Sequence, residues 1–111
     1  MLPSQWLDKP EKWCKGSYAV TKTGLPVMAS DPDACKWCVA GVINLMILKN
    51  NNWAVFENYL ETFRKVAGIV KPFTKNSDWN DAPERTWEEV HAALVETERR
   101  LGLLENVNEG S

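Results

Sequence analysis

The stretch "SDWNDAPERTWEEVH", residues 77–91, gathers side chains that can bind or react just before an expected helix start. It combines two indoles with an amide, a carboxylate and a guanidinium: Trp79, Asn80, Asp81, Arg85 and Trp87. Such a set could stack a base or another flat ring on tryptophan and hold its polar edges with the other groups. The alternative role is structural, because Asn and Asp before a proline commonly close turns onto nearby amides, and tryptophan commonly plugs the edge of a core.

His91, the only histidine, falls on the expected helix within reach of the turn that carries Asp81. A histidine and a carboxylate could do acid–base work if a nucleophile or a water were held between them. More often, a histidine in this place hydrogen-bonds a backbone carbonyl. The G-x-S-x-G, P-loop and H-E-x-x-H signatures are absent from the sequence. We therefore expect a noncatalytic protein and keep a small hydrolase or transferase using Asp81 and His91 as the alternative.

The cysteines raise the question of a metal, since Cys14, Cys35, Cys38 and His91 form a Cys3His set that could surround one zinc ion. Against zinc, Cys35 and Cys38 fall within an expected helix instead of a tight turn. Cys38 also falls on the apolar face, where a free cysteine is an ordinary small core residue. We expect reduced thiols and no cofactor, with a zinc-stapled interaction module as a further alternative.

Length and charge exclude several classes of protein. The 111 residues suffice for one hydrophobic core. A net charge of -2 offers no excess of positive charge to follow a phosphate backbone, so nonspecific nucleic-acid binding is not expected. No apolar run approaches the roughly 20 residues that cross a bilayer, and the start "MLPSQWLDKPEKW" does not resemble a signal peptide. We expect one cytoplasmic domain without membrane contact, with an ordered core over about 4–104 and a flexible C-terminal tail.

A helix over about 32–49 is expected at the centre of the fold. Asp31 would be its N-cap, and Pro32 suits the first helical turn. Apolar residues cover most of its circumference, which is typical of a helix surrounded by others. Gly41, halfway along, would let a neighbouring segment approach closely.

Two more helices follow. The first, over 53–68, has apolar side chains at spacings of three or four and is stopped by Gly68. Its expected buried stripe is Trp53, Phe56, Leu60, Phe63 and Ala67. The second begins with a T-x-x-E capping box formed by Thr86 and Glu89 and ends at Gly102. Its expected buried stripe is Trp87, Val90, Leu94, Thr97 and Leu101.

The remaining segments are less regular. Pro10 predicts two short turns or one broken helix at the N-terminus. Residues 18–29 predict a small hairpin or an extended loop, and residues 69–85 a surface loop. The fold class is therefore mainly α, a small single-domain helical bundle with a short hairpin or irregular segment near 18–29.

Two blocks, residues 13–43 and 79–90, resemble a family of small proteins from bacteriophages and from bacteria that carry prophages, catalogued as a domain of unknown function. The first block contains Trp-Cys-x-x-Gly, and the second contains an aromatic-Asn-Asp followed by a helix-opening Thr. The matching positions are Trp13, Gly16, Ala19, Gly24, Pro32, Ala34, Trp37, Cys38, Gly41, Trp79, Asn80, Asp81, Thr86 and Val90. Many members have histidine where this chain has Trp87. The resemblance implies a phage or mobile-element setting and no particular activity.

The patterns predict a noncatalytic protein that acts by stoichiometric binding, and the resemblance implies that it is a phage or mobile-element accessory protein in the host cytoplasm. It would sequester a small, nucleotide-like molecule or occlude a host protein, as an anti-defence factor does. If the two blocks converge, the predicted binding surface comprises Trp37, Trp79, Asn80, Asp81, Arg85, Trp87 and His91. A virion or assembly component is a further alternative and would self-associate. The sequence makes no prediction of the oligomeric state.

Overall fold

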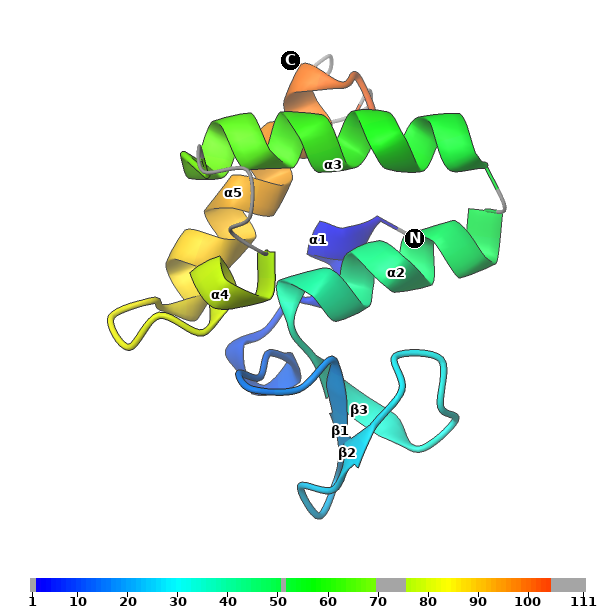
Figure 1. Cartoon of the computed structure of the whole chain (residues 1–111), viewed down its shortest axis with the longest axis vertical. Coiled ribbons are helices and arrows are strands. Elements are labelled where there is room, and N and C mark those ends of the chain that lie inside the picture. Colours follow the sequence, from blue (N-terminus) through cyan, green and yellow to red (C-terminus); the bar gives the residue numbers. More distant parts are fainter. Residues whose placement is uncertain (1, 51, 70–75, 105–111) are drawn as a thin grey trace.

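Three long helices carry most of the core in the computed structural model, which describes residues 2–50, 52–69 and 76–104 (Figure 1). They are α2 (Val39–Asn50), α3 (Trp53–Ala67) and α5 (Trp87–Arg100). The shorter segments are α1 (Pro3–Trp6), the 3-10 turn η1 (Pro10–Lys12) and α4 (Asn76–Asn80). The mainly α single domain is thereby confirmed. Of the two alternatives for the N-terminus, the structure has two separate short segments, α1 and η1. The predicted C-terminal tail lies mostly outside the described residues.

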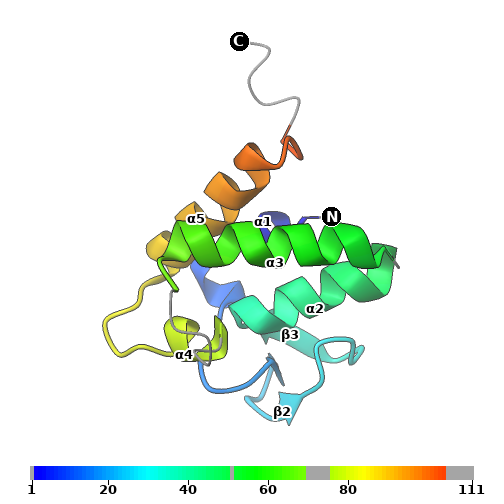
Figure 2. The ribbon, with the colours of Figure 1, turned by 45° about the horizontal axis from the view of Figure 1, so that its top comes forward.

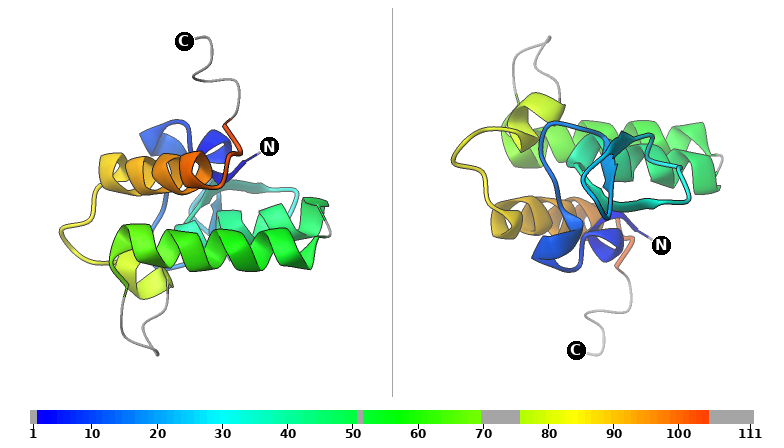
Figure 3. Two further views of the ribbon diagram at one scale, coloured as in Figure 1. Left: turned by 90° about the horizontal axis from the view of Figure 1, so that it is seen from above. Right: turned by 90° about the horizontal axis from the view of Figure 1, so that it is seen from below.

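The layers follow from how the helices pack. α2 lies between α3 and the sheet, as Figure 2 shows. α3 and α5 lie side by side, and α1 packs against α2 and α5 (Figure 3). No helix among the described residues has the length and apolar character needed to span a membrane.

A three-stranded antiparallel sheet stands between η1 and α2 in the chain. Its strands are β1 (Ala19–Thr21), β2 (Pro26–Val27) and β3 (Ala34–Trp37), in the order β2-β1-β3. Ala19 lies opposite Val27 on one side and opposite Trp37 on the other. Gly24 turns the hairpin with φ +90°, a conformation that favours glycine. The predicted hairpin is confirmed, and β3 adds a strand that was not predicted.

The predicted helix over 32–49 is wrong in its first part, because residues 34–37 are strand β3 and α2 begins only at Val39. Asp31 does not cap a helix. Its Oδ1 accepts the Asp33 amide at 2.8 Å, which closes a turn, and the chain then pairs with β1. The amide of Val39 instead donates to a side chain from far along the sequence, Asn80 Oδ1, at 3.0 Å. Long-range pairing has overridden a local helix signal.

The ends of α3 and α5 agree with the sequence. Gly68 ends α3 with φ +76°, and Thr86 and Glu89 form the predicted capping box, with Glu89 N donating to Thr86 Oγ1 at 3.3 Å and Thr86 N to Glu89 Oε1 at 3.0 Å. The predicted loop over 69–85 is wrong in part, since it contains α4, and its residues 70–75 lie outside the described residues.

Gly41 confirms the predicted close approach. A Cβ atom on this residue would lie 2.1 Å from the carbonyl oxygen of Tyr18, far inside contact distance. The chain just before β1 can therefore lie against α2 only because position 41 has no side chain.

The buried face of α3 differs from the predicted stripe. Trp53 is 61% exposed, whereas Tyr59, absent from that stripe, is fully buried. The reason is a polar cluster around Glu98 of α5, which is also fully buried. Tyr59 OH donates to Glu98 Oε2 at 2.6 Å, Ser4 N donates to the same oxygen at 3.0 Å, and the Ser4 hydroxyl donates to Glu98 Oε1. One carboxylate thus joins α1, α3 and α5.

Burial, reinforced by the charge of Glu98, raises the pKa of the Tyr59 hydroxyl well above its ordinary value. The phenol therefore remains a protonated donor to Glu98.

Candidate functional site

The two sequence blocks converge at a point that we call the Asn80 junction: Trp13, Cys14, Gly16, Val39, Asn80 and Asp81. Asn80 is fully buried, and its Oδ1 accepts Trp13 Nε1 at 2.7 Å and Val39 N at 3.0 Å. Its Nδ2 donates to the Cys14 carbonyl at 3.1 Å and to Asp81 Oδ1 at 2.9 Å. A primary amide has two donor hydrogens and two acceptor lone pairs, so the hydrogen-bonding capacity of Asn80 is filled by protein.

The groups next to Asn80 also hold the chain together. Asp81 Oδ1 accepts the Gly16 amide at 3.0 Å, and Lys15 Nζ donates to the Ala82 carbonyl at 2.7 Å. Both contacts tie the N-terminal loop to the turn after α4. They occupy the polar edge that the sequence suggested for a ligand.

Arg85 and Trp79 form a packed pair. The guanidinium carbon of Arg85 lies 4.0 Å from the Trp79 ring centroid, while Arg85 Nε donates to the Trp79 carbonyl at 2.9 Å. Trp79 meets Phe63 of the core in a T-shaped arrangement, with ring centroids 5.5 Å apart and planes at 90°. One partner thus covers a face of Trp79, and the other anchors it in the core.

Trp87 and His91 stack on each other, with ring centroids 5.0 Å apart and planes at 26°. Trp87 Nε1 donates to the Leu7 carbonyl at 2.8 Å, which attaches the N-terminal segment to α5. The hydrogen bonds given for Asp81 go to Gly16 and Asn80, and none joins it to His91 within the described residues. These contacts assemble no acid–base pair from Asp81 and His91.

The cysteines lie on separate elements: Cys14 in the loop after η1, Cys35 in β3 and Cys38 just before α2. All are free. Burial, followed by repulsion between the Cys14 and Cys38 thiolates, raises the pKa of Cys14 to about 12, and burial also raises the pKa of Cys38. In the part of the chain that the structure describes, no three His, Cys, Asp or Glu side chains are grouped to hold a metal ion. The zinc alternative therefore finds no ligand set there.

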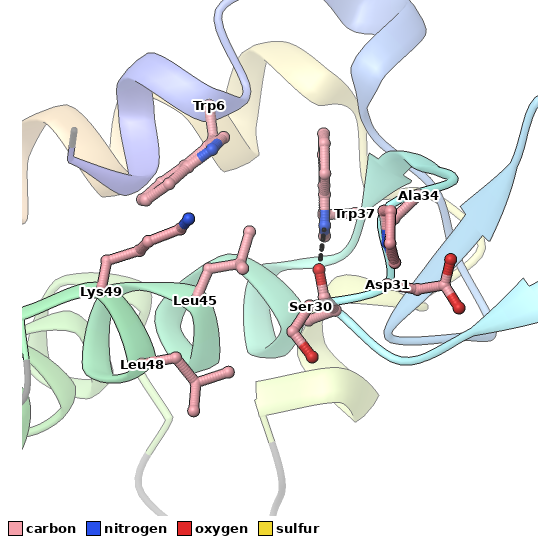
Figure 4. Close-up of a pocket in the computed structure, with 10 residues that line it drawn as sticks. Trp6, Ser30, Asp31, Ala34, Trp37, Leu45, Leu48 and Lys49 are labelled. Carbon is pink, nitrogen blue, oxygen red and sulfur yellow. Dashed lines mark hydrogen bonds between the residues drawn. The ribbon is translucent and has the colours of Figure 1, made fainter.

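A second region was not predicted: a cleft of about 460 Å³ between α1, the loop from β2 to β3, and α2 (Figure 4). Trp6 and Trp37 stand on opposite sides of it, with Leu45 between them and Lys49 near Trp6. We call it the Trp6–Trp37 cleft, lined by Trp6, Ala29, Ser30, Asp31, Pro32, Ala34, Trp37, Leu45, Leu48 and Lys49.

Trp37 belongs to both regions. Its carbonyl accepts the amide of Cys14 at 3.1 Å, beside the Asn80 junction, but its indole lines the cleft. The predicted grouping of the Trp37 side chain with Trp79 and Trp87 is therefore not among the contacts that the structure gives. The sequence analysis missed Trp6, Leu45 and Lys49. For Leu45 and Lys49, the i,i+4 spacing could have predicted that they share one face of a helix. The sequence gives no such indication for Trp6.

Comparison with known proteins places most of the chain in one family. Residues 5–100 match the model of a family described as a family of unknown function, DUF6197. No curated protein and no solved structure matches the chain.

Proposed function

We propose that this chain, which belongs to the family of unknown function DUF6197, acts without catalysis by binding its target stoichiometrically. One observation carries the proposal: at the Asn80 junction, protein groups fill the hydrogen-bonding capacity of Asn80 and also engage Asp81. Exposed aromatic surface suited to a ligand lies instead in the Trp6–Trp37 cleft.

The target that fits this arrangement best is a small, nucleotide-like molecule of the host. The cleft volume of about 460 Å³ lies within the roughly 300–1,000 Å³ of small-molecule sites. The resemblance of the sequence to phage and prophage proteins supports an accessory role for a phage or mobile element, in the host cytoplasm. Sequestering a host signal would make such a protein an anti-defence factor.

The experiment is a native mass spectrum of the full chain purified straight from cells, together with the small molecules released on denaturation. We expect one noncovalent adduct per chain and a released molecule that incubation with fresh protein leaves unchanged. His91→Gln is the matched variant, since it removes the titratable ring and should keep the adduct.

Conversion of the released molecule in many turnovers, abolished in His91→Gln, would overturn the proposal in favour of the hydrolase or transferase. A co-purifying host protein without a small-molecule adduct would mean that the chain occludes a protein instead.

A further inference from the structure

We infer that the Trp6–Trp37 cleft binds a flat aromatic molecule through its ring and holds a negative group of that molecule near Lys49. The inference rests on the proposed binding function and deepens it by assigning the site and the ligand class. Three features of the cleft support it: its two indole walls, the anchoring of those walls, and the sign of the charge at its rim.

The walls suit a flat ring. Trp6 and Trp37 are both half-buried, and the nearly buried Leu45, 6% exposed, forms an apolar floor between them. In Figure 4 the Trp37 ring is seen edge-on, so one of its faces looks across the hollow toward Trp6 and Lys49. Exposed indole faces in a partly apolar hollow are the surfaces on which bases and similar rings stack.

Each wall is held in place by hydrogen bonds within the protein. Trp37 Nε1 donates to the Ala29 carbonyl at 3.0 Å, and the Trp37 backbone is part of β3. Trp6 lies at the end of α1, which is tied to α5 by Ser4 N donating to Glu98 Oε2 at 3.0 Å. Walls that are anchored before a ligand arrives lose little freedom on binding, which favours affinity.

The charge at the rim is positive. Lys49 is exposed, extends toward the space between the indoles, and forms no ion pair with any described residue (Figure 4). The Asp31 carboxylate points away from the cleft and accepts the Asp33 amide at 2.8 Å. An uncompensated ammonium beside an aromatic slot selects a ring that carries an anion, such as a nucleotide phosphate.

The two indole N–H groups differ in whether they already have a hydrogen-bond partner. The Trp37 N–H is already bonded, whereas the Trp6 N–H has no hydrogen bond to the residues that the structure describes. The exposed Ser30 hydroxyl also lines the cleft. Both groups are available to a polar edge of the ligand.

The test is a calorimetric titration of the full chain with adenosine monophosphate, adenosine and inorganic phosphate as probes. The monophosphate should bind about 3- to 10-fold more tightly than adenosine through its charge, and phosphate alone should not bind measurably. Trp6→Ala should weaken the monophosphate about 10- to 100-fold. Lys49→Gln should reduce its affinity to that of adenosine.

The matched controls are Trp53→Ala, which removes an exposed indole from α3, and Lys22→Gln, which removes an exposed charge from the hairpin. Both should bind the monophosphate like the unaltered chain. Because Trp6 also packs against the core, Trp6→Leu serves as a second variant that keeps apolar bulk without an indole face. Its thermal unfolding should match that of the unaltered chain, so that lost affinity reports the missing indole.

Indole N–H signals in a nitrogen-15 spectrum give a readout that needs no mutation. The monophosphate should shift the signals of Trp6 and Trp37 and leave those of Trp13 and Trp53 in place. The inference is overturned if the monophosphate shows no saturable binding at millimolar concentration, or if Trp6→Ala binds it like Trp53→Ala. A native adduct that survives in Trp6→Ala and Lys49→Gln would overturn the site while leaving the binding function intact.

Discussion

The Asn80 junction and the Trp6–Trp37 cleft both combine tryptophan with polar side chains. They differ in whether the donors of those side chains already have partners within the protein. At the junction, Trp13 Nε1 and the Asn80 amide bond each other, and protein atoms fill the rest of the amide's capacity. In the cleft, the Trp6 N–H and the Lys49 ammonium have no hydrogen-bond or ion-pair partner among the described residues. Residue type alone thus does not separate a structural cluster from a binding surface.

Mutations in the two regions should have different consequences. The junction joins the N-terminal loop, α2 and α4 through buried and half-buried polar contacts around Asn80. Removing one partner of such a contact leaves the other unsatisfied, at a cost of about 1–3 kcal/mol where the group is buried. A change at Trp6 or Lys49 in the cleft leaves no hydrogen-bond partner among the described residues unsatisfied. Junction variants should therefore lose stability, and cleft variants should lose affinity.

The largest effect is expected for Asn80→Ala. It strands the Trp13 N–H, the Val39 amide and the Cys14 carbonyl inside the protein, so the free energy of unfolding should fall by about 3–5 kcal/mol. Urea denaturation measures the loss. Asn44→Ala is the control, because Asn44 is exposed on α2 and its replacement should change stability by less than about 0.5 kcal/mol. Equal stability of the two variants would mean that the hydrogen bonds of Asn80 do not stabilise the fold.

Glu98→Ala should have the next largest effect and should connect the two regions. It leaves Ser4 N, Ser4 Oγ and Tyr59 OH without their acceptor, so we expect a loss of about 2–4 kcal/mol. Since Ser4 lies in the same short helix as Trp6, a selective change of the Trp6 indole signal should accompany the loss. Glu88→Ala, at an exposed site of α5, is the control. A destabilised Glu98→Ala variant with an unchanged Trp6 signal would show that the cleft wall does not depend on Glu98.

Gly41→Ala should cost somewhat less, about 1–3 kcal/mol, because the new methyl group would press on the Tyr18 carbonyl and must displace it. Thermal unfolding monitored by circular dichroism checks the value. Ala40→Gly, at the neighbouring half-buried position, makes the opposite change and should lose only about 1 kcal/mol through helix propensity. If Gly41→Ala is as stable as the unaltered chain, the approach of this segment to α2 is not tight.

The smallest effect is expected from Glu96, which belongs to neither region. Its hydrogen bonds to Arg99, at 2.8 and 2.6 Å, and to Arg100, at 2.8 Å, lower its pKa from the ordinary 4.5 to about 2. Because the folded pKa lies below the unfolded one, these contacts stabilise the fold fully above pH 4.5, and the contribution disappears as the pH falls through 2.

Glu96→Gln should therefore be slightly less stable than the unaltered chain at neutral pH, and the difference should vanish in strong acid. Denaturation midpoints over an acid series measure it. High salt should reduce the difference, since both arginine partners are exposed and Glu96 is partly so. A difference that grows toward low pH would contradict the assignment.

The sequence by itself determined the features that depend on residues a few positions apart. The capping box of Thr86 and Glu89 and the left-handed end of α3 at Gly68 are closed by near neighbours, so their chemistry is visible in the pattern. The same holds for the hairpin turn at Gly24. Gly41 was read correctly for a related reason, since the lack of a side chain is a property of the residue itself.

Tertiary structure decided the features in which one residue can satisfy several partners. Asp31 and Pro32 carry helix-start signals, yet pairing with β1 made the following residues a strand. Tyr59 lies on the buried face of α3, where Glu98, far away in sequence, accepts a hydrogen bond from its hydroxyl, while Trp53 is exposed. The sequence suggested that Asn80 could hold a ligand, but in the structure its amide bonds with Trp13, Cys14 and Val39 instead. Residue type fixes how many hydrogen bonds a side chain can form, but the packing of distant segments decides which atoms form them.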